Sequence, residues 1–109
     1  MTDFRSLLKS GRFLYLDGGM GTMLQAAGVQ TDHVPELLNI TDPEVIMTVH
    51  RKYANAGSDV VYANTFGANR YKLQDCGHSV TEVVSAGIAN AKKAVDNKSL
   101  VALDIGPIG

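Results

Sequence analysis

The sequence has 109 residues, of which 45% are hydrophobic and 19% charged, and its formal net charge is −1. This composition is typical of one soluble globular domain, and the near-neutral charge argues against a protein that binds nucleic acid or a membrane surface. A single cysteine, Cys76, excludes an intramolecular disulfide, and neither a signal peptide nor a run of about 18 apolar residues is present, so the sequence predicts a cytoplasmic protein.

The N-terminal part predicts a short helix, a strand and a second helix. Apolar residues at helical spacing within the first ten residues predict an amphipathic helix that Gly11 ends. The apolar residues 13–16 predict a buried strand. Good helix formers at residues 22–27, followed by Gly28, predict the second helix.

A loop and a strong helix start follow. Residues 29–40 show no hydrophobic period and predict a loop with one helical turn at residues 36–38. Asp42-Pro43-Glu44 predicts a helix start in which the aspartate caps with its side chain, and Gly57 ends this helix. Its apolar stripe is expected to pack in the core and consists of Val45, Ile46, Val49 and Tyr53.

Two strands and two helices complete the predicted order. Residues 59–66 are nearly all apolar, which is typical of a strand covered on both faces, and residues 100–105 predict another strand. Between them, residues 69–74 predict a short helix. A capping box at residues 79–82 predicts a longer helix that continues to Asn97.

The alternation of helices and strands predicts an α/β fold with parallel strands. The strands begin near Leu14, Val60 and Leu100, which are 46 and 40 residues apart. Eight units of about 43 residues would need roughly 340 residues, so this chain would supply about three βα units of a TIM (β/α)8 barrel. Such a piece would leave an unpaired strand edge.

Polar or glycine-rich clusters follow all three strands, at residues 17–22, 64–67 and 106–109. Ligands bind at this edge of parallel α/β folds. In the first cluster, glycines and the amides of a helix start favour a carboxylate, and Asp17 favours an ammonium group, which together suit a zwitterion. The structural alternative is that Asp17 caps a turn and the glycines supply positive φ. For Asn64, ligand binding and support of the loop backbone both stay open.

Nucleotide and metal sites have weaker support. A dinucleotide fingerprint that starts at Gly19-Met20-Gly21 would need glycine or alanine at position 24, where Leu24 stands, and no P-loop motif occurs. Cys76 has no nearby base that would make it a nucleophile. Metal-ligand spacing is also missing among the three histidines, which are His33, His50 and His78.

Six segments stand out together: Leu16–Thr22, Pro35–Asn39, Pro43–Ile46, His50, Ala56–Asp59 and Asn64–Asn69. In order and spacing they resemble the homocysteine S-methyltransferase family, which includes the cobalamin-dependent methionine synthases. The resemblance implies that residues 1–109 are an N-terminal fragment of a homocysteine-binding TIM-barrel domain. It also implies the reaction, in which zinc activates the homocysteine thiolate and this thiolate accepts a methyl group to give methionine.

The resemblance also implies which residues contact homocysteine. The expected substrate-binding residues are Asp17, Gly18, Gly19, Gly21, Thr22 and Asn64. The family's zinc ligands are three cysteines that occur later in the chain than residue 109, and Cys76 matches none of them. The resemblance therefore assigns neither a metal ligand nor a catalytic residue to this chain, and the isolated chain is expected to be inactive. Ile108 stands where threonine is common in the family.

Two questions stay open at this stage. The methyl donor, which could be cobalamin or methyltetrahydrofolate on another module, S-methylmethionine or a betaine, is not encoded in these residues. The alternative function is a non-catalytic module that binds small amino acids or self-associates through its strand edge. Affinity for homocysteine or methionine without zinc would favour that alternative.

Overall fold

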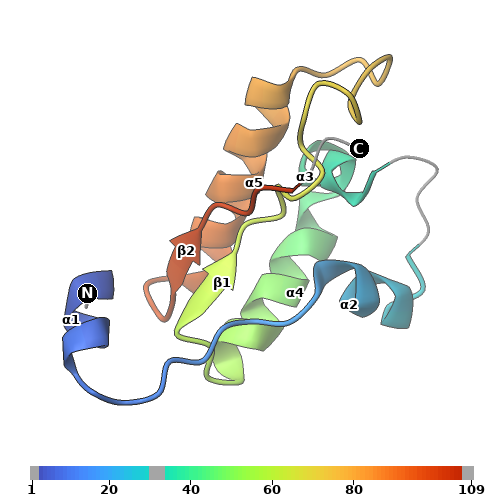
Figure 1. The fold of residues 1–109 in the computed structure, drawn as a ribbon. Coiled ribbons are helices and arrows are strands. Elements are labelled where there is room, and N and C mark those ends of the chain that lie inside the picture. The colour runs from blue at the N-terminus through green and yellow to red at the C-terminus, as the bar shows by residue number, and fades with distance from the viewer. Residues whose placement is uncertain (1–2, 30–33, 107–109) are drawn as a thin grey trace.

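The computed structural model describes residues 3–29 and 34–106, which form an α/β fold (Figure 1). Strand β1 (Val60–Tyr62) pairs in parallel with β2 (Leu100–Ala102), and Val61 lies opposite Val101. The predicted α/β class and the parallel pairing are confirmed. The described residues contain two regular strands, so they do not confirm three βα units.

The first predicted strand, residues 13–16, is reduced to one bridge. Leu16 pairs in parallel with Val60, and the Asp17 amide donates to the Val60 carbonyl at 3.1 Å. The Tyr15 carbonyl accepts from the amides of both Asp59 and Val60, so one acceptor serves two donors and no regular ladder develops. The predicted strand is therefore wrong in extent, but the segment still lies beside β1 and places Asp17 at its end.

The other two strands are shorter than predicted because polar side chains replace the ladder. The amide of Ala63 still donates to the Ala102 carbonyl at 2.8 Å, one residue beyond the regular strands. Further on, the Thr65 hydroxyl accepts from the Asp104 amide at 3.0 Å and donates to the Asp104 carbonyl at 2.8 Å. The segments that follow β1 and β2 therefore stay together without regular strand pairing.

Two helices cover one face of the sheet and pack against each other, α4 (Pro43–Asn55) and α5 (Val80–Val95) (Figure 1). The predicted capping box at the start of α5 is confirmed, with both of its hydrogen bonds present. The predicted side-chain cap of α4 is wrong, since Asp42 makes no such bond. Asp42 precedes a proline, which restricts its backbone. Its amide donates to the Leu38 carbonyl at 2.9 Å, which closes the last turn of the preceding helix.

The N-terminal helices agree with prediction apart from their bounds. Helix α1 (Phe4–Lys9) is present, and α2 (Met20–Ala26) begins two residues earlier than expected and ends before Gly28, whose φ is 78°. In place of a single turn, the segment before α4 contains the 3-10 helix η1 (Pro35–Leu37) and α3 (Leu38–Thr41).

The predicted helix at residues 69–74 is wrong. This segment forms consecutive turns, in which the Asn69 side chain accepts from the Lys72 amide at 2.8 Å. Asp75 then adopts a φ of 60°, which a continuing helix would not allow. The side chain of Asn69 thus competes with helical hydrogen bonding.

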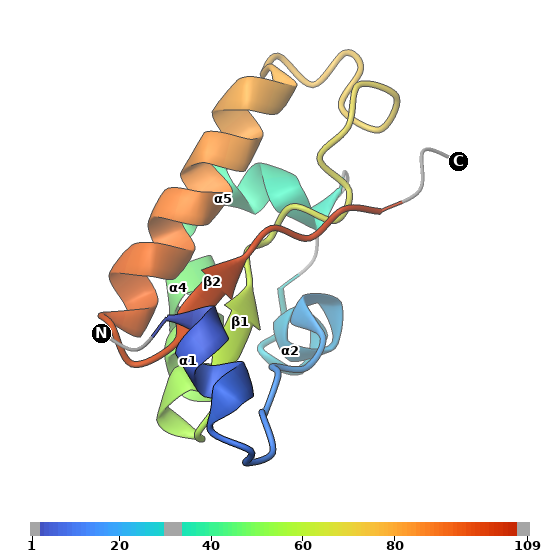
Figure 2. The same cartoon turned by 60° about the vertical axis from the view of Figure 1, so that its left-hand side comes forward.

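The core lies between the helices and the sheet, and the opposite sheet face stays largely open. Tyr53 on α4 contacts both buried clusters, one around Ile46 and one around Val61. Helix α1 lies across the other face (Figure 2), with an apolar hollow that is lined in part by Phe4, Leu16 and Tyr62. Within the described ranges β2 has a partner on one side only, so the predicted unpaired edge is present. None of the described helices is long and apolar enough to cross a membrane.

Candidate functional site

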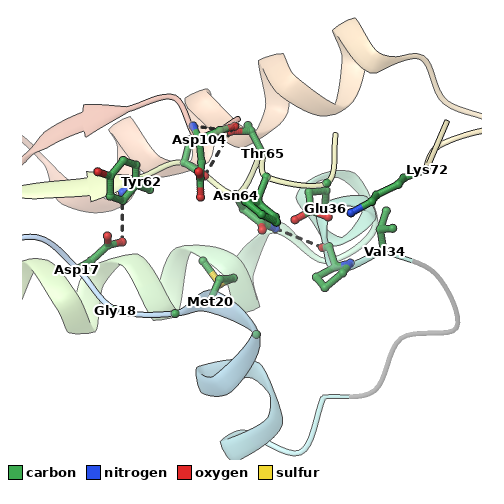
Figure 3. Close-up of a pocket in the computed structure, with 16 residues that line it drawn as sticks. Asp17, Gly18, Met20, Val34, Glu36, Tyr62, Asn64, Thr65, Lys72 and Asp104 are labelled. Atoms are coloured by element: carbon green, nitrogen blue, oxygen red, sulfur yellow. Dashed lines mark hydrogen bonds between the residues drawn. The ribbon is translucent and has the colours of Figure 1, made fainter. Parts of the chain in front are cut away.

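A cleft of about 350 Å³ opens at the C-terminal ends of the strands (Figure 3). It is lined by residues 17–21 between the first bridge and α2, by residues 34–36 around η1, and by residues 62–67 after β1. Lys72 and Asp104 complete the lining. The clusters that follow the first two predicted strands therefore meet in one place, as expected for this edge of a parallel sheet.

The cleft brings together five of the six residues that the sequence analysis proposed for substrate binding. These five are Asp17, Gly18, Gly19, Gly21 and Asn64. Thr22 does not line the cleft. Thr22 is exposed, and its hydroxyl oxygen lies 3.5 Å from the position that a Cβ on Gly19 would take. Of the third cluster, only Gly106 lies within the described residues, and Ile108 lies outside them.

Asp17 has one oxygen that is free of hydrogen bonds. Its Oδ2 accepts from the Tyr62 amide at 3.2 Å, while Oδ1 is buried and has no partner within the described chain. Burial raises the pKa of Asp17 to about 6, and the negative charge of Asp104 acts in the same direction. This carboxylate is therefore held at the end of β1 with capacity for a cationic partner.

Replacing Asp17 by asparagine is expected to stabilise the protein by a few degrees in melting temperature at about pH 8. The folded state raises the pKa of Asp17 from 3.8 to about 6, so the charged carboxyl is disfavoured in the native state above that pH. The gain should shrink towards about pH 4, where wild-type Asp17 is protonated when folded. Calorimetry at both pH values checks this, with the exposed Asp75→Asn as control. A gain that is the same at both pH values would contradict it.

The glycine turn is needed for a close approach. Gly18, Gly19 and Gly21 do not adopt positive φ, so that structural alternative is wrong for them. A Cβ on Gly18 would lie 2.7 Å from the Tyr53 hydroxyl oxygen, and this hydroxyl donates to the Gly19 carbonyl at 3.0 Å. Tyr53 therefore fixes the turn from α4. Helical periodicity placed Tyr53 in the core stripe but gave no sign of what its hydroxyl reaches.

Asn64 is part of a buried polar network. Its amide nitrogen donates to the Pro35 carbonyl at 3.2 Å and to Asn39 Oδ1 at 2.9 Å. The Asn39 amide nitrogen in turn donates to the carbonyls of Asn64 and Val83, at 2.8 and 3.1 Å. Asn64 thus supports the loop backbone, which is one of the two roles left open by the sequence. The network ties η1 and α3 to the end of β1 and to α5.

Three charged lining residues were missed by the sequence analysis: Glu36, Lys72 and Asp104. Asp104 follows the last strand, so its position offered a signal. Glu36 is only 6% exposed, and the Lys72 ammonium lies 5.7 Å from the centre of the Phe66 ring. No local sequence pattern predicts that Glu36 or Lys72 lines the cleft, because the cleft forms from segments that are distant in the sequence.

The described residues do not fit a zinc site. Across residues 3–29 and 34–106, no group of three or more His, Cys, Asp or Glu could hold a metal ion. Cys76 does not line the cleft, and its sulfur contacts the backbone of His78. His50 is fully buried in α4, where burial lowers its pKa to about 4, and His33 lies outside the described residues.

Comparison with known proteins extends over most of the chain. The family model for homocysteine S-methyltransferase matches residues 14–109. Methionine synthase from Mycobacterium tuberculosis is 39% identical over 103 residues, covering 87% of this chain and 9% of that protein. The Mycobacterium leprae methionine synthase is 37% identical over 93 residues, covering 78% of this chain and 8% of that protein. The chain thus spans less than a tenth of these relatives.

Solved structures show the same similarity. The homocysteine methyltransferase MmuM from Escherichia coli, in its oxidized form, matches with a TM-score of 0.81 and 25% identity, covering 94% of this chain and 40% of that chain. The metallated form of the same enzyme matches with a TM-score of 0.80 and 27% identity, covering 94% and 41%.

Proposed function

Because this chain belongs to the homocysteine S-methyltransferase family, we propose that its cleft binds homocysteine as the acceptor of a methyl group. The observation that carries the proposal is the partly buried Asp17 carboxylate beside a glycine turn, at the cleft where the strands end. An α-amino acid presents an ammonium and a carboxylate close together, and this arrangement offers a carboxylate and backbone amides close together.

Each proposed contact is assigned from the charge or the hydrogen-bonding capacity that the group retains in the structure. The Asp17 carboxylate pairs with the substrate ammonium, and the backbone of Gly18, Gly19 and Gly21 leaves room for the substrate carboxylate. Both amide hydrogens of Asn64 are engaged, so only its side-chain oxygen can contact substrate. Thr22 lies outside the lining and makes no contact in this proposal.

We also propose that residues 1–109 are the N-terminal part of a TIM-barrel domain. In that arrangement further strands pair with the free edge of β2 and cover the apolar hollow beside α1. The zinc that would favour the homocysteine thiolate is proposed to be held by three cysteines beyond residue 109, since the described residues do not fit a zinc site. A methyl donor such as cobalamin would be carried by another module.

One observation favours the alternative function, a self-associating module that binds amino acids without catalysis. Leu16 is 53% exposed and Tyr62 is 37% exposed on the open sheet face, so a second copy could cover them. Native mass and metal analysis of the full-length protein separate the two hypotheses. One zinc per monomeric chain supports the methyltransferase, and a zinc-free oligomer supports the alternative.

Asp17→Asn is expected to weaken homocysteine binding by about tenfold to a hundredfold, because a charge-assisted pair with the ammonium becomes neutral. Titration calorimetry on the full-length protein measures the affinity. Asp75→Asn, which removes an exposed carboxylate away from the cleft, is the matched control. Equal affinities for wild type and Asp17→Asn would overturn the proposed role of this residue.

A further inference from the structure

Tyr53 connects the core to the glycine turn that follows Asp17. Its ring packs against both buried clusters from the last turn of α4, and its hydroxyl donates to the Gly19 carbonyl at 3.0 Å. Gly18 passes so close to this hydroxyl that a Cβ on Gly18 would lie 2.7 Å from its oxygen. The Tyr53 side chain does not line the cleft, so it reaches a bound ligand only through the turn.

The two glycines make this turn dependent on contacts from outside it. Glycine leaves the backbone more conformational freedom than any other residue, and Gly19 precedes α2 without a side-chain hydrogen bond that caps the helix. Strand β1 holds Asp17 itself, because its amide donates to the Val60 carbonyl at 3.1 Å and its Oδ2 accepts from the Tyr62 amide at 3.2 Å (Figure 3). The contact with Tyr53 fixes the backbone two residues further on, so β1 and α4 hold the segment from two sides.

The direction of the free Asp17 oxygen depends on both supports. Oδ1 is buried without a hydrogen-bond partner in the described chain, and the backbone of residues 17–19 sets where it points. Burial raises the pKa of the Tyr53 hydroxyl, and the negative charge of Asp17 adds to this effect, so the hydroxyl remains a donor at neutral pH. Losing this donor would let the turn shift, which changes the position of the carboxylate without removing its charge.

We propose that Tyr53 is a positioning residue for ligand binding, whose hydroxyl holds the glycine turn so that Asp17 Oδ1 meets the ammonium of a ligand in the cleft. This inference rests on the proposed function in taking Asp17 as the partner of that ammonium. Tyr53 itself makes no contact with the ligand. Its effect on binding is therefore transmitted through Asp17 and disappears when the carboxylate is absent.

A double-mutant cycle in the full-length protein tests whether Tyr53 acts through Asp17. The variants are Tyr53→Phe, Asp17→Asn and the two combined, and titration calorimetry measures their affinities for L-homocysteine. We expect Tyr53→Phe to weaken binding by about threefold to tenfold in the wild-type background, which corresponds to the loss of one hydrogen bond. In the Asp17→Asn background the same change should cost less than about twofold. An equal loss in both backgrounds overturns the inference, and so does the lack of a loss in either.

Two analogues of homocysteine separate positioning from a general loss of structure. 3-Aminopropanethiol keeps the ammonium and lacks the carboxylate, and 4-mercaptobutanoate keeps the carboxylate and lacks the ammonium. Tyr53→Phe should weaken binding of the first analogue as it weakens binding of homocysteine, and it should leave binding of the second unchanged. A loss of equal size for 4-mercaptobutanoate would contradict the inference. Tyr71→Phe removes an exposed hydroxyl outside the cleft lining, so this matched control should change none of the affinities.

The same measurements distinguish a failure of the inference from a failure of the proposed function. If wild type binds homocysteine and Tyr53→Phe leaves its affinity unchanged, the proposed function stands and the inference fails. If wild type binds 3-aminopropanethiol with the expected coupling between Tyr53 and Asp17 but does not bind homocysteine, the inference stands and the proposed function fails. Binding of neither compound to wild type overturns both.

Discussion

Replacing Asn39 by alanine is expected to lower the free energy of unfolding by about 3–5 kcal/mol. Asn39 is 2% exposed and donates to two buried carbonyls, those of Asn64 and Val83. It also accepts one of the two hydrogen bonds from the Asn64 amide nitrogen. Alanine would leave the Asn64 carbonyl and one amide hydrogen of Asn64 without the partners described here, in a buried place, which costs more than the hydrogen bonds themselves contribute.

Chemical denaturation of the full-length protein measures this loss. Asn55→Ala is the matched control, because the Asn55 side chain is exposed and, among the described residues, bonds to the Lys98 ammonium alone, so its loss should cost less than about 0.5 kcal/mol. Gly87 adds a second observation on the network: a Cβ there would lie 2.8 Å from the Asn39 amide nitrogen. If Asn39→Ala costs no more than Asn55→Ala, the network does not support the fold in the way described.

Local signals in the sequence predict the helices apart from the one expected at residues 69–74, and they predict the strand lengths poorly. The capping box at Ser79 predicts the start of α5, since both partners lie within one turn of the chain. The strands stop early because Thr65 bonds the backbone of Asp104, a contact between residues far apart in sequence. Asp42 fails as a side-chain cap for a related reason, because its backbone is shared between two helices.

Some residues of the candidate site were likewise predictable from the sequence, and others were not. The position of Asp17 after the first strand was predictable, because the ends of parallel strands meet at one edge. The burial of Glu36 was not predictable from the helical turn expected at residues 36–38, because it involves Gly67, which lies far along the chain and contacts the Glu36 carboxylate. Asn39 was likewise missed, because a buried asparagine is recognised only by the carbonyls that it reaches.

His50 is expected to account for a loss of up to about 3 kcal/mol in stability between about pH 6.5 and pH 4. The ring is fully buried in α4 and neither nitrogen has a partner within the described chain, and burial lowers its pKa to about 4 from 6.5. The unfolded chain therefore binds a proton in this range before the folded protein does. Stability is fully present above the unfolded pKa and falls as the pH drops towards the folded one.

His50→Leu removes this proton linkage, so we expect a flatter loss of stability in acid and little change at about pH 7. Urea denaturation at several pH values measures the profile, and His78→Gln is the control because that ring is partly exposed and lies against Glu82. Asp17 acts with the opposite sign, since its pKa is raised to about 6 and folding favours its protonated form. Asp17→Asn should therefore steepen the acid loss that His50→Leu flattens. If the two variants change the profile in the same direction, the assignment of these two buried groups is wrong.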